Sequence, residues 1–431
     1  NNYIMCVKQK LVVVGGGFAG IYLVKHINRR LYDVVLIDSN NYHSFPPLFY
    51  QIASAGLDPA SIAFPFRREM RKLKPLPEYH FGEVKSIDTD KKTVTTQYET
   101  ISYDRLVIAA GTRNNFFGMA DLDKYVFTIK RTSEALRCRN EILDRFERAA
   151  ICHDADKRRR LLSFTVIGGG PTGVEIAGAL GEMKRFLLKR EYPTINPDEM
   201  TITLAEGSDR LLQTMSNEAS AYALKALRHL MVDVQLGRQM KSYSDNTLTF
   251  ADGESIYSEM VIWTAGVTAA TFNTTGTPFS LGHGGRILVD EFNRAIGFGD
   301  DIMAIGDISL HATSDNPRGC PQVAQVAIQQ ARTLAHNLNR HSWHRTFRYH
   351  DKGSMATIGR GRAVADLKRL HLKGWPAWMA WMFVHLISIL GMRNKVAVLV
   401  NWIWAYFTYP TSLRLLIHPE RYPLRHRWGE S

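Results

Sequence analysis

Short apolar runs that end in glycines recur along this chain and predict the buried parallel strands of an α/β protein. Residues 11–14 (LVVV) form the first run and are followed by Gly15, Gly17 and Gly20. Isoleucine or valine then recurs at helical spacing, at positions 21, 24 and 27. An uninterrupted apolar run is typical of a strand covered on both faces, and the helical period after the glycines predicts a strand–turn–helix unit.

The glycine spacing of this first unit is that of a dinucleotide site. Gly15 permits the tight turn, Gly17 lets the backbone approach a pyrophosphate, and Gly20 lets the helix pack on the strand. The helix N-terminus then faces the phosphates. Residues 33–38 (DVVLID) predict the next strand, and Asp38 at its end is placed to accept from a ribose hydroxyl. An incidental glycine turn remains the alternative.

A second unit of the same kind begins at the strand predicted for residues 161–167. The same glycine spacing follows it, at Gly168, Gly170 and Gly173. Residues 200–206 (MTITLAE) predict the next strand, which ends in Glu206 after an unusually long insertion. An acid here accepts from both ribose hydroxyls and repels a 2′-phosphate, which favours NADH over NADPH, although the nearby Arg210 weakens that preference.

Three further apolar runs end in glycine motifs and extend the repeat. They are residues 103–112 (YDRLVIAAGT), 259–268 (EMVIWTAGVT) and 300–307 (DDIMAIGD). The first two follow the first and second nucleotide units, so the chain repeats a whole pattern and not only a loop. We therefore predict an α/β fold with two nested Rossmann-like domains, one that retains FAD and one that binds NADH. Each run taken singly could be an ordinary core strand.

Charge and cysteine content narrow the class of protein. The net charge of +13 indicates either a nucleic-acid binder or a protein held at an anionic membrane surface. The four cysteines are scattered without any C-x-x-C, which suits a reducing compartment and offers no zinc site. His43 and His311 lack partners at metal-ligand spacing, so we expect no metal. No apolar stretch precedes the first strand, and we expect no signal peptide.

The C-terminal region explains the charge. Residues 351–431 contain twelve Lys or Arg and four Asp or Glu, which flank two tryptophan-rich apolar runs at 374–391 and 396–409. We predict two amphipathic helices that lie in a membrane interface, because tryptophan prefers the headgroup level and basic residues attract anionic lipids. A transmembrane hairpin and a dimer-forming helical pair remain alternatives, and no nucleic-acid-binding module is found. On this interpretation a chain cut after Lys373 keeps its FAD.

Several stretches resemble the flavoprotein superfamily with two dinucleotide-binding domains: GGGFAG, VIGGGPTGVE, AAGT, WTAG and AIGD. Within it, residues 40–57, 321–331 and 351–367 are similar to the type II (non-proton-pumping) NADH:quinone oxidoreductases. The resemblance implies a flavoenzyme that transfers a hydride from NADH to FAD and then two electrons to a membrane quinone. It further implies a peripheral protein on the cytoplasmic face of a bacterial inner membrane, and a homodimer is possible.

The domain organisation follows from the same motifs. The FAD-binding domain is expected in two parts, residues 1–118 and 291–350. The NADH-binding domain is expected between them at 119–290, with its core at 161–268, and the membrane-binding region at 351–431.

The resemblance also implies which residues hold each ligand. FAD would be held by Gly15, Gly17, Phe18, Ala19, Gly20, Asp38, Ser39, Val84, Ala110, Gly111, Asp307 and Ala324. NADH would be held by Gly168, Gly170, Pro171, Thr172, Gly173, Glu206, Ala265 and Gly266. The quinone would meet Tyr50, Gln51, Gln325 and Gln329, with Gln325 beside the isoalloxazine as a catalytic residue.

Glu175 is the second expected catalytic residue, two positions behind the last glycine of the second unit. A carboxylate is favoured there by the helix dipole, so a capping or pairing role is one hypothesis. The other places Glu175 beside the nicotinamide and flavin, where it orients NADH and relays protons during quinone reduction.

Three other functions stay open at this stage. A sulfide:quinone oxidoreductase resembles this fold but needs cysteines that pass sulfur to the flavin, for which Cys320 with Cys138 or Cys152 are the candidates. Another FAD- and NAD(P)-dependent reductase is the second, although a disulfide reductase would need a cysteine pair after the first unit. The third is a redox-sensing FAD/NAD binding protein that acts through partner contacts.

Overall fold

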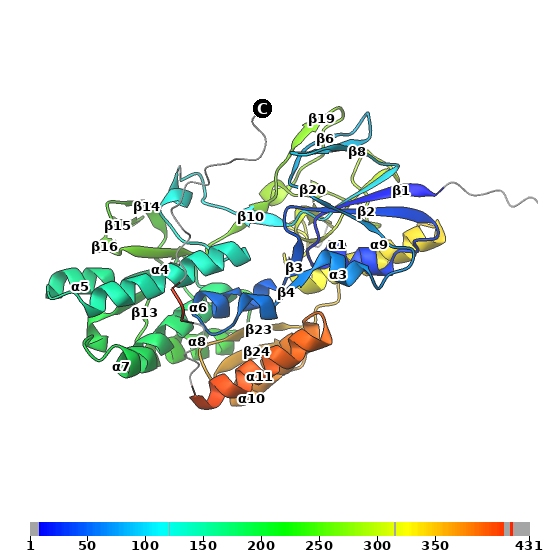
Figure 1. The fold of residues 1–431 in the computed structure, drawn as a ribbon. Helices are drawn as coiled ribbons and strands as arrows, with labels where there is room; N and C mark the ends of the chain where they lie inside the picture. Colours follow the sequence, from blue (N-terminus) through cyan, green and yellow to red (C-terminus); the bar gives the residue numbers. More distant parts are fainter. Residues whose placement is uncertain (1–7, 120, 314–315, 409–413, 417–431) are drawn as a thin grey trace, which may run out of the picture.

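The computed structural model describes residues 8–119, 121–313, 316–408 and 414–416. Two α/β units lie side by side, and a smaller unit formed by the C-terminal part of the chain packs beneath them (Figure 1). Each larger unit is built on a parallel sheet, and every predicted apolar run contributes a strand to one of the two sheets. The predicted α/β fold with two dinucleotide-binding units is confirmed.

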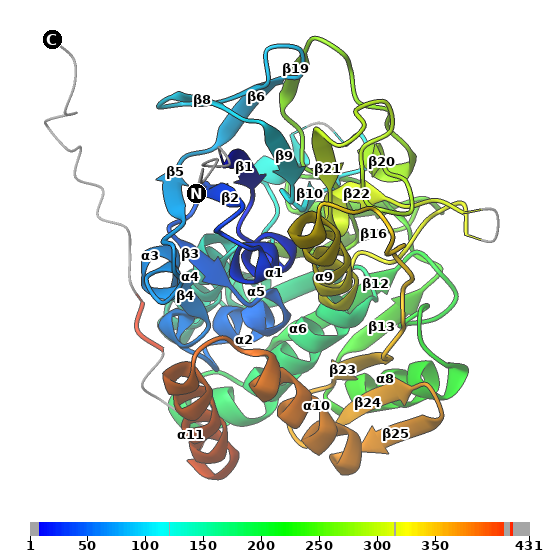
Figure 2. The same ribbon diagram turned by 90° about the vertical axis from the view of Figure 1, so that its right-hand side faces the viewer.

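The first unit contains a five-stranded parallel sheet in the order β21-β9-β1-β2-β5. Its strands are β1 (Gln9–Val14), β2 (Tyr32–Asp38), β5 (Glu78–Phe81), β9 (Arg105–Ile108) and β21 (Ile302–Ala304). Leu11 and Val13 of β1 pack in one core with α1 (Phe18–His26) and α9 (Ala324–Arg340), which lie together on one face of the sheet (Figure 2). Val12 and Val14 belong to the core on the opposite face. Both faces are covered, which explains why the run is apolar at every position.

The second unit repeats this plan with the parallel order β13-β12-β11-β17. Its strands are β11 (Ser163–Ile167), β12 (Thr201–Glu206), β13 (Asp233–Leu236) and β17 (Met260–Trp263). Its helices are α4 (Thr132–Ala150), α5 (Ala155–Leu161), α6 (Pro171–Glu182) and α8 (Asn217–His229). The insertion before Glu206 continues α6 through a π-helical turn (Met183–Leu187) into α7 (Leu188–Glu191). An antiparallel sheet of β14 (Met240–Ser244), β15 (Thr247–Phe250) and β16 (Ser255–Tyr257) packs on the other face.

Short strands join the two units. β10 (Thr112–Asn114) pairs with β18 (Val267–Ala269), where the chain enters and leaves the second unit. β19 (Asn273–Thr275) then pairs with β6 (Val84–Asp88), which continues into β7 (Thr93–Thr96) and β8 (Thr100–Ser102). β20 (Ile287–Leu288) pairs with β22 (Ser309–Leu310). β19 thus pairs with a strand of the first unit ahead of residue 290, and the predicted domain bounds stay a prediction.

The C-terminal unit begins with an antiparallel sheet that the sequence patterns did not predict. Its strands are β23 (Ser354–Thr357), β24 (Ala363–Leu367) and β25 (Leu370–Gly374). The two predicted helices follow as α10 (Trp375–Ser388) and α11 (Met392–Thr408), called the tail helices below. Neither of these, nor any other helix among the described residues, combines the length and apolar character that crossing a membrane requires.

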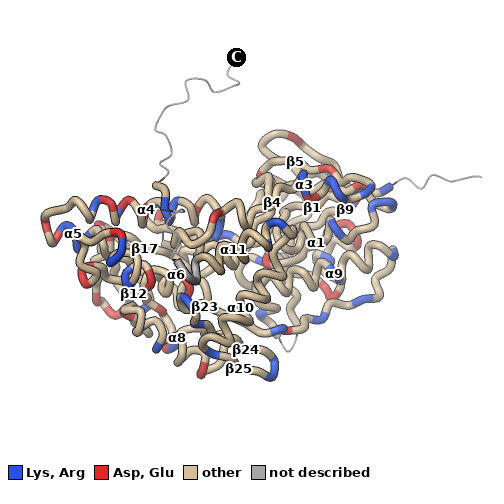
Figure 3. The backbone as a smooth tube through the Cα atoms, turned by 60° about the horizontal axis from the view of Figure 1, so that its bottom comes forward, with Lys and Arg blue, Asp and Glu red and all other residues tan. Residues whose placement is uncertain are grey.

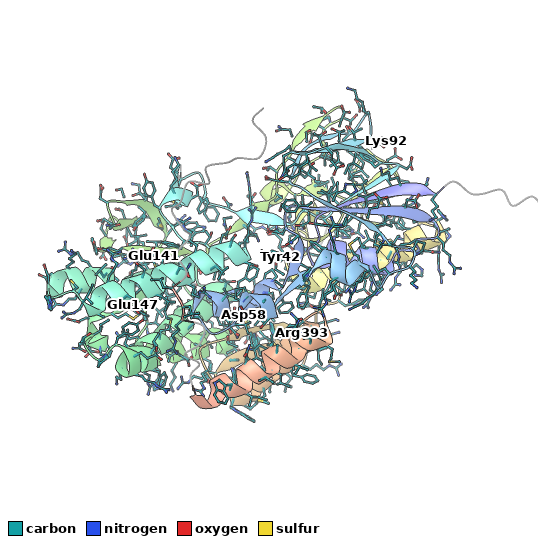
Figure 4. The ribbon with its side chains drawn as sticks, in the orientation of Figure 1. Tyr42, Asp58, Lys92, Glu141, Glu147 and Arg393 are labelled. Atoms are coloured by element: carbon teal, nitrogen blue, oxygen red, sulfur yellow. The ribbon has the colours of Figure 1, made fainter. Side chains whose placement is uncertain are left out.

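The tail helices belong to the main hydrophobic core. Trp381, Ile389, Val398 and Trp402 lie in one buried cluster with residues of α4, α6 and the short helix α2 (Phe49–Ala53). Asn394 also donates through Nδ2 to the carbonyls of Ala60 and Ser61, at 3.1 and 3.0 Å. Figure 4 shows Arg393, at the start of α11, below the segment that carries Asp58. The tail helices are therefore part of the core. The expectation that a chain cut after Lys373 keeps its FAD treated them as separate from it.

Candidate functional site

The first glycine turn is closed by contacts that only glycine permits. Gly15 has a φ of +98°, and a Cβ there would lie 2.4 Å from the carbonyl oxygen of Ala109. A Cβ on Gly20 would lie 1.8 Å from the carbonyl oxygen of Gly15. Gly17, in contrast, has open space where its Cβ would be. Two glycines therefore serve the turn, and the third leaves room at the N-terminus of α1 for a ligand.

The second glycine turn is built in the same way. Gly168 has a φ of +108°, and its Cβ would lie 2.7 Å from Cα of Ala265. A Cβ on Gly173 would lie 1.8 Å from the carbonyl oxygen of Gly168, whereas Gly170 faces open space. Pro171 and Thr172 after it are exposed at the start of α6. The Ala-Gly ends of β9 and β17, at Ala110 with Gly111 and Ala265 with Gly266, lie beside the two turns.

The acids at the ends of β2 and β12 hold the glycine turns themselves. Asp38 Oδ2 accepts from the backbone N–H of Gly16 at 2.6 Å, and Glu206 Oε2 accepts from that of Gly169 at 2.5 Å. The other oxygen of Glu206 accepts from Ser208 N and Oγ, at 2.8 and 2.5 Å. The long insertion therefore does not displace Glu206, which makes the same contact as Asp38.

Burial raises the pKa of Asp38, against the lowering effect of the hydrogen bonds from Gly16 and Asn40. Ser39 beside it is exposed. Val84, at the start of β6, is half-buried beside the first sheet. Phe18 and Ala19 open α1 directly after Gly17, and the ring of Phe18 meets that of His43 edge-on at 5.3 Å.

His43 is neutral and buried, and it contacts the first glycine turn. It lies on β3 (Tyr42–Ser44), which pairs with β4 (Ala63–Pro65) ahead of α3 (Phe66–Met70). Burial lowers the pKa of His43 to about 4, and Nδ1 lies 2.9 Å from the carbonyl oxygen of Gly16. His311 packs its ring edge-on against Phe347. The described part of the chain contains no cluster of three His, Cys, Asp or Glu suited to a metal ion.

Asp307 lies on a turn that packs against α9, with two cations nearby. Burial raises its pKa, while Lys130 and Arg286 lower it. The preceding Gly306 donates its N–H to Gln330 Oε1 at 2.7 Å, and Gln330 Nε2 donates to Ser309 Oγ at 2.9 Å. Ala324 is the first residue of α9, near this turn.

Gln330 and Lys130 were not predicted as site residues from the sequence patterns. Gln330 could have been found, because it is a polar residue on the apolar stripe of α9 between Ala327 and Ala331. Lys130 follows no glycine motif and ends no apolar run, so no pattern marked it.

Glu175 is buried on α6. Its exposed fraction is 7%, and burial raises its pKa well above the ordinary value of 4.5. The backbone N–H of Thr357, on β23, points to Oε1 at 3.4 Å. Burial disfavours the charged form, so this carboxyl keeps its proton to a higher pH than an exposed glutamate does.

A chain of hydrogen bonds runs from Thr357 to the tail helices. Tyr50 Oη lies 2.9 Å from Thr357 Oγ1, and Gln51 Nε2 donates to Tyr50 Oη at 2.9 Å. Trp402 Nε1, on α11, donates to Gln51 Oε1 at 2.9 Å. The structure thus brings together the predicted residues Glu175, Tyr50 and Gln51, and it adds Thr357 and Trp402.

Gln325 and Gln329 lie elsewhere. Gln325 Nε2 donates to the carbonyl of Gly353 at 3.1 Å, and its Oε1 accepts from Lys352 N at 3.0 Å. Gln329 makes two bonds to the backbone of His350, each 2.9 Å long. Both glutamines hold the segment that leads into β23, and their place at the quinone stays a prediction.

A cleft opens between α2, α6 and the tail helices, and we refer to it as the tail cleft. It encloses about 980 Å³, part of it open to solvent, with mostly apolar walls. The residues that line it include Tyr50, Gln51, Glu182, Arg360, Trp381 and Trp402. Glu182 accepts from the backbone N–H of Arg360 at 2.5 Å, and burial raises its pKa. Tyr50 lines the cleft and contacts Thr357, whose backbone N–H points to Glu175.

Comparison with known proteins gives consistent matches. Residues 9–331 match the family described as pyridine nucleotide-disulphide oxidoreductase, and residues 351–408 match the NDH2 C-terminal domain. The type II NADH:quinone oxidoreductase NdhA of Mycobacterium tuberculosis is 32% identical over 416 residues, covering 92% of this chain and 86% of that protein.

Two solved structures share the fold. NDH2 from Plasmodium falciparum in complex with NADH has a TM-score of 0.86 at 22% identity, covering 95% of this chain and 100% of that one. The sulfide:quinone oxidoreductase of Aquifex aeolicus has a TM-score of 0.71 at 18% identity, covering 95% and 96%.

Proposed function

Because this chain belongs to the type II NADH:quinone oxidoreductases, we propose that it transfers electrons from NADH through FAD to a quinone without pumping protons. One observation carries the assignment of the site. Helix α6 begins at the second glycine turn and ends at the tail cleft, with Glu175 and Glu182 two turns apart on one face. A single helix therefore connects the nucleotide turn to an apolar cleft.

The first unit fits FAD. The open space at Gly17 and Gly111 leaves room for the pyrophosphate, and Asp38 fixes the turn that would bind it. Asp307 would accept from the ribityl hydroxyls, with Lys130 as a nearby cation. When bound, FAD supplies the two-electron chemistry that accepts a hydride from NADH and delivers electrons to the quinone.

The second unit fits NADH. Gly170 leaves open space at the N-terminus of α6, where the helix dipole favours a pyrophosphate. Glu206 would accept from the adenosine ribose, with its remaining lone pairs, while it holds Gly169. The Ala265 and Gly266 turn would close over the nucleotide.

The tail cleft fits the ring of a quinone. Its aromatic and apolar lining suits a flat apolar molecule, and the Gln51 amide can donate to a quinone carbonyl oxygen. Glu175 connects to this region through Thr357 and Tyr50, and burial raises the pKa of its carboxyl. We assign Glu175 the role of supplying a proton during quinone reduction.

The outer faces of the tail helices support contact with a membrane. Side chains with more than a third of their surface exposed include Trp375, Phe383, Ile387, Val396, Val400 and Ile403. Charged residues are scarce here, as the mostly tan tubes of α10 and α11 in Figure 3 show, and Arg393 and Lys395 mark the start of α11. Such a face would be immersed in the interface, with the cleft beside it. The cytoplasmic face of a bacterial inner membrane and the homodimer stay predictions.

The cysteines do not favour sulfide as the reductant. Cys138 is fully buried on α4, and burial raises the pKa of its thiol. Burial also raises the pKa of the half-buried Cys320 thiol. Neither environment stabilises the thiolate that sulfur transfer needs.

Rapid mixing of the purified flavoprotein tests the proposal in two steps. NADH should bleach the flavin absorbance, and a short-chain quinone should restore it. Sulfide should bleach nothing. Bleaching by NADH without reoxidation by any quinone would contradict the quinone assignment and favour a redox sensor or a carrier-protein reductase.

A further inference from the structure

Trp402, Gln51 and Tyr50 are linked by two hydrogen bonds, and the chemistry of the Trp402 indole fixes the direction of both. An indole N–H can donate but has no acceptor capacity, so it must meet the oxygen of the Gln51 amide. The amide nitrogen of Gln51 must then lie on the side of Tyr50, to whose hydroxyl oxygen it donates. The indole N–H can only donate, so it fixes the orientation of the Gln51 amide, which could otherwise exchange its oxygen and nitrogen positions.

The same logic extends to Tyr50. Its hydroxyl oxygen accepts from Gln51, and its hydrogen is free to go to Thr357 Oγ1, 2.9 Å away. Burial, with a smaller contribution from Glu175, raises the pKa of Tyr50, so the hydroxyl keeps this hydrogen. The first two bonds thus run in one direction, from Trp402 to Gln51 and from Gln51 to Tyr50.

Packing holds Trp402 in place. Its exposed fraction is 8%, its ring centroid lies 5.6 Å from that of Trp381, and Val398 one turn earlier is fully buried. The position of the indole is therefore set by the docking of α11 and not by the cleft contents.

We propose that Trp402 is a positioning residue that orients the Gln51 amide toward the quinone, so that α11 completes the quinone site. This rests on the proposed function. The amide nitrogen of Gln51 carries two hydrogens, one of which goes to Tyr50, and the other is available to a quinone carbonyl in the tail cleft that Gln51 lines. Without the indole N–H the amide can rotate by half a turn and present its oxygen, which repels a carbonyl.

Kinetics of Trp402→Phe test the proposal. The change removes the donor and keeps an aromatic ring, so FAD content and NADH-driven reduction of ferricyanide should stay within twofold of wild type. The KM for a short-chain quinone should rise about five- to tenfold, as expected for one lost hydrogen bond, with a smaller change in kcat.

A double-mutant cycle separates positioning from mere packing. In a Gln51→Met background, Trp402→Phe should raise the quinone KM no further. Trp381→Phe is the matched comparison, because Trp381 Nε1 is buried and meets no acceptor among the described residues. Its effect should multiply with that of Gln51→Met. Equal, multiplying effects of both tryptophan changes would overturn the proposal.

A spectroscopic measurement keeps the proposal testable even if no quinone is turned over. With ¹⁵N-labelled tryptophan, the indole N–H signal that disappears in Trp402→Phe belongs to Trp402. Gln51→Met should move that signal upfield and speed its exchange with water. A signal that Gln51→Met leaves unchanged would overturn the hydrogen bond, whereas failure of quinone reduction in wild type alone would overturn only the proposed function.

Discussion

At the scale of single residues, the chemistry depends on how the surroundings of each carboxyl group favour or disfavour its charged form. Glu175 is buried, which raises the pKa of its carboxyl, whereas Asp38 and Glu206 each accept a hydrogen bond from a glycine turn. These three carboxyl groups are alike in the sequence and differ in their surroundings. Two testable consequences follow from that difference.

The first consequence concerns how the ionisation of the buried Glu175 carboxyl changes the free energy of unfolding with pH. Its pKa is raised in the folded state, so between about 4.5 and the folded value the native protein holds a proton that the unfolded chain has lost. Wild-type stability should therefore fall with rising pH in this window, by at most about 1.4 kcal/mol per pH unit from this group. Glu175→Gln lacks this slope and should become relatively more stable as pH rises, while it keeps FAD and loses most quinone turnover. Thermal unfolding of both proteins across pH checks the first point, and wild-type turnover in the variant would contradict the second.

The second concerns Glu206 and nucleotide preference. Glu206→Gln can still accept from Gly169 but has no charge, and it should narrow the gap between NADH and NADPH. Glu206→Ala also loses the support of the turn. A charge-assisted hydrogen bond is worth about 1.5–3 kcal/mol, so the KM for NADH should rise about tenfold or more in Glu206→Ala and less in Glu206→Gln. Steady-state kinetics with both nucleotides give the answer, and an unchanged ratio would assign the preference to another residue.

At the scale of elements, the tail helices have two apolar faces with separate roles. One packs in the core, and the other is exposed. Phe383 and Ile387 lie one turn apart on the exposed face, with 65% and 54% of their surface accessible.

Replacement of both by serine should weaken binding to lipid vesicles about tenfold or more, because a large apolar side chain contributes about 1.5–3 kcal/mol when fully buried. FAD content should not change, since neither side chain supports the core. The matched control is Tyr125→Ser with Ile151→Ser, which removes equally exposed apolar groups outside the tail helices. Co-sedimentation with vesicles compares the two variants, and equal losses would show that the exposed tail face is not the docking surface.

At the scale of the whole molecule, the tail helices share one hydrophobic core with the second nucleotide unit and with residues 45–64. A chain cut after Lys373 would lose Trp381, Ile389, Val398 and Trp402 from the main core. At about 1.5–3 kcal/mol each, their loss is comparable to the 5–15 kcal/mol that stabilises a typical domain. We therefore expect the truncated protein to unfold at a much lower temperature or to aggregate. A truncated protein with wild-type melting temperature and FAD content would contradict this.

The sequence predicted the parts of the site that rest on local geometry. Gly15 and Gly168 mark turns that no other residue can form, and an apolar strand before each turn is a pattern of adjacent residues. The link between Trp402 and Gln51 joins positions 351 residues apart, and no period or spacing reports such a contact. The dual role of Glu206 was hidden for a similar reason, because its bond to Gly169 exists only once β11 and β12 have paired.

The composite origin of the tail cleft has a pharmacological consequence. Its walls come partly from residues 50–56 and 179–187, inside the region that matches the broad oxidoreductase family, and partly from residues 359–402, inside the NDH2-specific region. An inhibitor seated there would contact both regions at once. It should therefore spare flavoproteins that share the nucleotide units and lack the C-terminal domain, whereas a mimic of either dinucleotide would not discriminate.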